Sequence, residues 1–231
     1  MPEAKFVSNH TVKLIDKMGD DLAVVNDARV SMDKHHDLFD TFSDTRLIKY
    51  LAKHQHWTPF AQTLAKLHIE LPIFTLRQLQ RSEVGRVFNE VSGRYAICFD
   101  TYFIQDKYHN KPTGSIKQGR GERLAKHEED CLKELIKANS RASYDNYQFI
   151  LGKGIAPEEA REILPLNVMT KIRITGSLAF WARVYNLRSA PDAQYAINLL
   201  ADKIAEVVAP IAPISWDALT KEVRNVSNNS L

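Results

Sequence analysis

The chain has 231 residues, enough to bury a substantial core as one large domain or two small ones. Hydrophobic residues make up 44% and charged residues 26%, an ordinary balance for a globular protein in water. The net charge of +3 is too small to argue for nucleic-acid binding, and no apolar run approaches a membrane span. Cys98 and Cys131 form neither a metal-binding pair nor a disulfide framework, so we expect a reducing, cytoplasmic environment.

Strand and helix signals follow one another without a regular repeat in the first third of the chain. The period-two alternation of Leu67-His68-Ile69-Glu70-Leu71 is typical of a half-buried strand, and Pro72 suits the first turn of a following helix. The predicted elements are, in order, a strand at 12–15, a helix capped by Asp20 or Asp21, a polar loop at 33–44, a helix capped by Asp44 and broken at Pro59, and the strand at 67–71.

Helical signals dominate the rest of the chain. An irregular polar segment at 100–121 is the best candidate for a mobile loop. After it we expect a long helix from about 122 to Gly152, a short helix at 157–164, a strand at 166–175, and helices at 176–187, from Asp192 to 209, and at 215–223. Long helices with few strands, in no strict β-α alternation, indicate an α+β fold rather than a doubly wound sheet.

The segment from Arg77 to Tyr95 concentrates groups suited to phosphate. It holds four arginines together with Gln78, Asn89, Glu90 and Ser92. Guanidinium groups bind phosphate through paired hydrogen bonds, and a Ser-Gly loop adds further donors. From composition alone, a solvated basic helix face explains the same residues equally well.

The sequence FNEVSGRY at 88–95 resembles the signature of the flavin-dependent thymidylate synthases. Other segments resemble the same family in the family's order, and the spacing between Arg161 and Arg188 also matches. These segments are 16–33, 54–60, 72–78, 158–167 and 185–197. Because the resemblance covers nearly the whole chain, the sequence is identified as a divergent member of that family.

The resemblance implies a single α+β domain over residues 1–231, with long helices packed on a small mixed or antiparallel sheet. It also implies a homotetramer with active sites at subunit interfaces. In this family FAD, reduced by NADPH, delivers a hydride to dUMP, and methylenetetrahydrofolate supplies the carbon that becomes the C5 methyl of dTMP. No cysteine attacks the uracil ring there, and no metal, nucleic acid or membrane is implied.

The resemblance assigns residues to both ligands. Arg188 matches the family arginine whose fixed cation polarises the uracil ring, so it is the candidate catalytic residue. For each arginine taken alone, a surface ion pair is the alternative, but their joint order and spacing favour binding. The candidate dUMP-binding residues are Gln78, Arg81, Glu90, Ser92, Gly93, Arg94, Arg161 and Arg188. The candidate FAD-binding residues are Thr58, Arg81, Ser82, Glu83, Asn89, Glu90 and Arg183.

The flavin-contacting motif departs from the family pattern. The family has Arg-His-Arg, seven residues and then Ser, whereas this chain has Arg81-Ser82-Glu83 and one residue more before Ser92. Gly85 is suited to absorb the extra residue, and we hypothesise that Arg86 replaces the lost cation. The candidate dUMP-binding residues match the family pattern. The flavin side of the site therefore departs from the family more than the nucleotide side does.

Three functions stay open at this stage. The favoured one is a divergent flavin-dependent thymidylate synthase. The second is an enzyme that acts on dUMP or a related pyrimidine monophosphate with altered one-carbon chemistry. The third is a non-catalytic nucleotide-binding relative, against which the retained Arg188 counts, because a phosphate binder needs no cation at the base.

Overall fold

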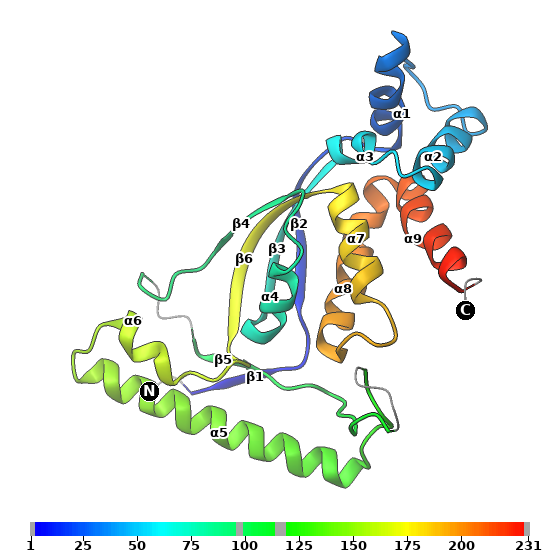
Figure 1. Ribbon diagram of the computed structural model, residues 1–231. Coiled ribbons are helices and arrows are strands. Elements are labelled where there is room, and N and C mark those ends of the chain that lie inside the picture. The colour runs from blue at the N-terminus through cyan, green and yellow to red at the C-terminus, as the bar shows by residue number, and fades with distance from the viewer. Residues whose placement is uncertain (1–2, 96–98, 114–118, 229–231) are drawn as a thin grey trace.

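A curved, four-stranded antiparallel sheet runs through the centre of the fold in this computed structural model, which describes residues 3–95, 99–113 and 119–228 (Figure 1). The strands are, in sheet order, β2 (Thr11–Met18), β3 (Leu64–Pro72), β6 (Met169–Ser177) and β4 (Arg86–Glu90). The predicted alternation in β3 is confirmed, because Leu67, Ile69 and Leu71 are fully buried. The long central pair β3–β6 therefore anchors both edge strands.

Helices pack on the sheet and gather at its two ends. Figure 1 shows α5 crossing one end of the sheet, while α1, α2, α3 and α9 lie together at the other. The helices are α1 (Asp21–Arg29), α2 (Ser43–Lys53), α3 (Thr58–Gln62), α4 (Ile73–Gln80), α5 (Lys126–Gly152), α6 (Pro157–Ala160), α7 (Leu178–Arg188), α8 (Tyr195–Val208) and α9 (Pro213–Asn228). Short 3-10 turns occupy Val30–Met32, Arg161–Ile163 and Ala209–Ile211.

The main core lies between one face of the sheet and α7 and α8. Trp181 on α7 is fully buried, and its indole N–H donates to the carbonyl of Ala65 on β3 at 3.3 Å. On α8 the residues that recur at helical spacing, Ile197, Leu200 and Ile204, are all buried, as the sequence predicts. The α+β class is confirmed by this arrangement.

A second apolar cluster fixes α5 beside a small parallel sheet. That sheet pairs β1 (Lys5–Val7) with β5 (Thr101–Phe103). Tyr144 and Tyr147 of α5 pack there with Phe99 and Tyr102, all of them buried. In the described ranges, no helix is long and apolar enough to cross a membrane.

Several predicted boundaries are wrong for identifiable reasons. Asp44 lies inside α2 rather than at its cap, because its buried carboxylate pairs with Arg29 at 2.6 Å. Asp192 does not cap α8, whose N-cap residue is Gln194. Pro59 lies in the first turn of α3 instead of breaking a helix, since proline fits the first helical turn. The strands β4 and β5 were not predicted, and α5 begins at Lys126 rather than near 122.

Cys131 is an exposed free cysteine. Cys98 lies outside the described residues. The capping prediction for α1 is confirmed at Asp20, whose side chain accepts the amide of Ala23 at 2.9 Å.

Candidate active site

The predicted nucleotide-binding residues fall into two separate cavities, which meet different faces of α4. Successive residues on a helix point about 100° apart, so neighbours in sequence face different directions. Phe74 and Gln78, four residues apart, face one cavity. Ile73 and Arg77, also four apart, face the other. We call these the Arg188 cavity and the Arg94 cavity.

The Arg188 cavity has a volume of about 980 Å³ and contains three of the predicted residues, Gln78, Arg81 and Arg188. The Gln78 amide nitrogen donates to Gln194 Oε1 at 2.6 Å, which links α4 to the start of α8. Arg81 is the exposed C-cap residue of α4. The guanidinium groups of Arg81 and Arg188 therefore share one polar cavity with that of Arg120, an arrangement suited to a ligand with several acceptor oxygens.

Arg188 is a constrained cation of this cavity. It is the last residue of α7, and its Nη2 donates to the backbone carbonyl of Gln78 at 2.8 Å. Its Nε is buried and has no hydrogen-bond partner. Burial, and after it the charge of Arg81, lower the pKa of Arg188 from its ordinary value. A buried donor without a partner costs about 1–3 kcal/mol.

The Arg94 cavity has a volume of about 720 Å³ and contains four other predicted residues, Glu90, Ser92, Arg94 and Arg161. It shares no lining residue with the Arg188 cavity. Arg94 is largely exposed and lies 3.6 Å from the carboxylate of Glu158. Such a loose, exposed ion pair contributes little, so Arg94 can exchange its carboxylate partner for a phosphate.

The turn that carries Ser92 and Arg94 is closed by its own hydrogen bonds. The amide of Arg94 donates to Ser92 Oγ at 3.2 Å, and the amide of Tyr95 donates to the Ser92 carbonyl at 3.1 Å. Gly93 sits against the ring of Phe99, and a Cβ there would lie 2.5 Å from Phe99 Cε2. The backbone can follow this path only because residue 93 has no side chain.

The remaining predicted flavin-side residues line neither cavity. Thr58 begins α3, Ser82 and Glu83 follow α4, Asn89 lies on β4 and Arg183 lies on α7. Glu90 lines the Arg94 cavity and accepts a hydrogen bond from Thr170 Oγ1 at 2.8 Å. One chain thus brings together the nucleotide-side residues in two groups, but it does not gather the flavin-side residues.

The altered loop after α4 is held by two arginines. Arg86 Nε donates to the Ser82 carbonyl at 2.5 Å and its Nη2 to the Gln80 carbonyl at 2.9 Å. Arg183 Nη2 donates to the Val84 carbonyl at 2.5 Å. Gly85 has φ +90°, a conformation that suits glycine, as expected for the extra residue. Arg86 therefore stabilises the loop backbone, and its proposed contact with flavin stays a prediction.

Sequence reasoning missed several residues of the two cavities. Arg77 lines the Arg94 cavity as a third guanidinium group. Because Arg77 and Gln78 are adjacent on a helix, the sequence indicates that they point in different directions. It does not indicate which cavity each of them faces. Tyr108, His109 and Arg120 reach the Arg188 cavity from a segment interpreted only as a loop.

The fold and the two cavities define an α+β protein with two separate arginine-lined cavities. The chain matches the family model described as "Thymidylate synthase complementing protein" over residues 13–214. It is 35% identical to a flavin-dependent thymidylate synthase of Thermus thermophilus, over 92% of this chain and 76% of the relative. It is 36% identical to that of Ruegeria pomeroyi, over 90% of this chain and 69% of the relative.

A solved structure agrees with these relatives. The UMP/dUMP methylase PolB from Streptomyces cacaoi, bound with 5-Br UMP, superposes with a TM-score of 0.85 at 27% identity, covering 94% of this chain and 96% of that one. The chain belongs to the flavin-dependent thymidylate synthase family.

Proposed function

We propose that the protein is an FAD-dependent methyltransferase that converts dUMP to dTMP. Methylenetetrahydrofolate is the carbon donor and NADPH the source of reducing equivalents. The C5–H bond of uracil would break and release its proton, and a C5–carbon bond would form as the methylene's two bonds to the folate nitrogens break. A hydride supplied by NADPH through bound FAD would complete the methyl group, leaving tetrahydrofolate and NADP⁺. The observation that carries the proposal is Arg188, a half-buried cation with an unpartnered Nε in a cavity with Gln78 and Arg81.

Arg188 makes C5 of the uracil nucleophilic in this proposal. Negative charge builds on the ring carbonyls as C5 attacks, and a fixed cation beside them stabilises it. The hydrogen bond from Arg188 Nη2 to the Gln78 carbonyl orients the guanidinium, which lines the cavity. Arginine stays protonated even with its pKa lowered by burial, so its charge is available throughout the working pH range.

The residues present fit a flavin on the same donor chemistry. The exposed guanidinium of Arg81 offers donors to an anionic, acceptor-rich cofactor in a cavity of about 980 Å³. Arg81 and Glu90, with Thr58, Ser82, Glu83, Asn89 and Arg183, are the residues we propose to hold FAD. When bound, reduced FAD supplies the hydride.

A complete site requires a second copy of the chain. One dUMP needs the phosphate donors of the Arg94 cavity and the base-polarising Arg188, but these cavities share no residue. We propose that Ser92, Gly93, Arg94 and Arg161 of one subunit meet Gln78, Arg81 and Arg188 of another. Exposed apolar side chains on β2 and α5 offer surface for such an assembly, which we propose is a homotetramer: Leu14, Ile15, Met18, Leu135 and Phe149.

We further propose that residues 1–231 form one domain of this kind, and a cytoplasmic location stays a prediction. The experiment that tests the function measures the mass of the nucleotide product. Protein, dUMP, FAD, NADPH and methylenetetrahydrofolate are combined anaerobically, beside an Arg188→Ala control. Thymidylate from the wild type alone supports the proposal. Unchanged dUMP, in protein that binds it, contradicts the proposal.

An alternative substrate, UMP, is tested in the same assay. The solved relative is described as a UMP/dUMP methylase, so the same assay is run with UMP. A hydroxymethyl product would indicate altered one-carbon chemistry on the same scaffold. Methylation of UMP in preference to dUMP would move the substrate from the deoxynucleotide to the ribonucleotide.

A further inference from the structure

The segment after β5 forms a hairpin-like wall of the Arg188 cavity. Its described arms, 108–113 and 119–124, are joined where the Leu124 amide donates to the Tyr108 carbonyl at 2.9 Å. The Asn110 amide donates to the Glu122 carbonyl at 2.9 Å, and His109 and Arg123 form an isolated antiparallel β-bridge. We call these two arms the 108–124 hairpin. Arg120 and His109 on it line the Arg188 cavity.

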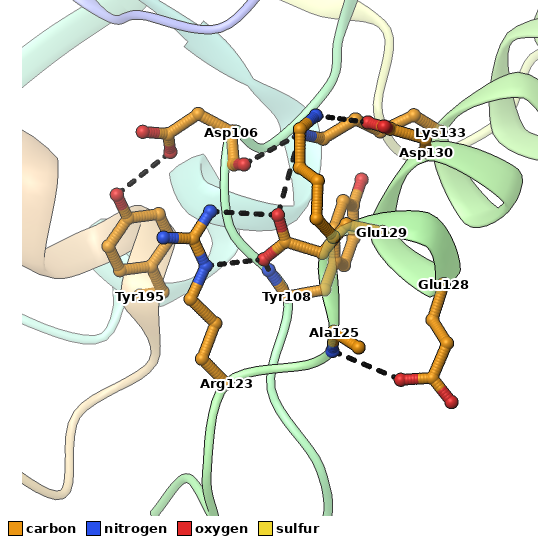
Figure 2. Close-up of polar contacts among 10 residues, drawn as sticks. Asp106, Tyr108, Arg123, Ala125, Glu128, Glu129, Asp130, Lys133 and Tyr195 are labelled. Atoms are coloured by element: carbon orange, nitrogen blue, oxygen red, sulfur yellow. Dashed lines mark hydrogen bonds and ion pairs between the residues drawn. The ribbon is translucent and has the colours of Figure 1, made fainter.

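A buried carboxylate on α5 fixes the base of this hairpin, as Figure 2 shows. Glu129 has no exposed side-chain surface, and it accepts both Nε and Nη2 of Arg123 at 2.8 Å. It also accepts the Tyr108 amide at 3.1 Å. The paired hydrogen bonds from Arg123 lower the pKa of Glu129 to about 2. The hairpin is therefore held at both arms by one ionised group.

Arg120 extends from the anchored hairpin to α8. Its Nη2 donates to Asn198 Oδ1 at 2.8 Å, and its guanidinium lies over the Tyr195 ring, 5.4 Å from the centroid. The Tyr195 hydroxyl donates to the carboxylate of Asp106 at 2.8 Å, next to the hairpin base (Figure 2). Arg120 is thus oriented by a hydrogen bond and by a ring that is itself fixed.

Asn198 continues the connection to the end of α7. Its amide nitrogen donates to the backbone carbonyl of Arg188 and, at 3.2 Å, to that of Ala190. These carbonyls belong to the last turn of α7 and the residues after it, where helix carbonyls have no partner within the helix. One amide therefore accepts from the hairpin with its oxygen and holds the Arg188 backbone with its nitrogen.

We propose that Arg120 and Asn198 are positioning residues for Arg188. Arg120 orients the Asn198 amide, and that amide holds the C-terminal turn of α7, so that the Arg188 guanidinium is fixed toward its cavity. Neither residue needs to touch the nucleotide for this role. The inference rests on the proposed function only for the catalytic part played by Arg188.

Asn198→Asp separates the two halves of the connection. The carboxylate keeps an acceptor for Arg120 but loses the N–H donors to the carbonyls of Arg188 and Ala190. We expect Asn198→Asp and Asn198→Ala to lower kcat for thymidylate formation about tenfold, with KM for dUMP within about twofold. Arg120→Ala should lower kcat in the same direction, and Arg120→Lys, which keeps one donor, should restore part of it.

Two controls make these kinetics specific. The Arg120→Ala/Asn198→Ala double variant should be no worse than Asn198→Ala alone, because both residues act through one connection. Lys111→Ala removes an exposed cation from the same hairpin and should leave kcat unchanged. Equal losses in Lys111→Ala and Arg120→Ala, additive losses in the double variant, or wild-type kcat in Asn198→Asp would overturn the proposal.

Hydrogen exchange in ligand-free protein tests the connection independently of the reaction. The Ser189 amide donates to the Tyr185 carbonyl at 2.8 Å, and the Ala193 amide to the Ala190 carbonyl at 3.1 Å. In Asn198→Asp these two amides should exchange faster, while the Leu124 amide at the hairpin base stays protected. Unchanged exchange at Ser189 overturns the proposal. If the wild-type protein makes no thymidylate, the proposed function is refuted, but the hydrogen-exchange result still tests the connection.

Discussion

Gly93→Ala should damage the Arg94 cavity through one steric contact. An alanine Cβ at this position meets Phe99 Cε2 at 2.5 Å and Cζ at 2.6 Å. Phe99 is 6% exposed and packs edge-on against Tyr147, with ring centroids 6.2 Å apart, so the ring has little room to withdraw. Overpacking of this kind costs about 1–3 kcal/mol.

The strain should appear in stability and in binding. We expect urea unfolding to show a free energy of unfolding lower by about 1–3 kcal/mol. Because the turn is more exposed than the ring, it should move and take Ser92 and Arg94 with it. Calorimetric titration should then show dUMP binding weakened about ten- to a hundredfold, equivalent to about 1.4–2.8 kcal/mol.

Gly152→Ala is the matched control. Nothing lies within 4 Å of a Cβ at that position, which is the last residue of α5. We expect it to be neutral or to stabilise the protein by at most about 1 kcal/mol, with dUMP affinity unchanged. If Gly93→Ala and Gly152→Ala behave alike in both assays, the reasoning from the Phe99 contact is wrong.

Three further predictions follow from single contacts. Burial lowers the pKa of His10 to about 4 from 6.5, so the neutral imidazole's contribution to the free energy of unfolding should be complete above pH 6.5 and should decrease as pH falls toward 4. In urea unfolding curves measured at a series of pH values, His10→Phe should make this decrease smaller. The pKa of Glu129 is likewise lowered to about 2 from 4.5, so its contribution should be lost only as pH falls below 4.5, whereas Glu129→Gln should speed amide exchange in the hairpin already at neutral pH. Arg86→Ala releases two backbone carbonyls, and its FAD affinity should fall about tenfold further than that of Val87→Ala; equal affinities would remove Arg86 from the flavin site.

Local chemistry made much of the fold predictable from the sequence. The alternation in β3 and the apolar spacing on α8 arise from burial of one face, so each is visible within the segment itself. Asp20 caps α1 because its short carboxylate reaches an amide three residues on, which is also a local signal. The resemblance to family motifs predicted the arginines of both cavities that we assign to nucleotide binding.

The rest depends on partners distant in the sequence. Asp44 resembles a helix cap, but the pairing with Arg29, fifteen residues earlier, buries its carboxylate inside α2. β4 is a strand because it pairs with β6, with Phe88 opposite Ile174, and its own residues carry no clear alternation. Pairings of this range cannot be derived from either segment alone.

The division of the candidate site into two cavities was likewise not predictable. Arg77 and Gln78 are adjacent in sequence, and only the packing of α4 against β3 and α8 decides which cavity each one meets. The link from Arg120 through Asn198 to Arg188 joins three segments of the chain, so no spacing rule reveals it. The family resemblance pointed to these residues, and the structure distributes them over two cavities.

Mixing two inactive variants tests most directly whether one site needs two chains. Arg94→Ala disables the phosphate group of residues and Arg188→Ala disables the base-polarising group, so each variant alone should make no thymidylate. After subunit exchange, random assembly in equal amounts should leave about one site in four with both arginines intact. Recovery of about a quarter of wild-type activity is the predicted result. Mixed oligomers, confirmed by native mass spectrometry, that remain inactive would contradict the shared site.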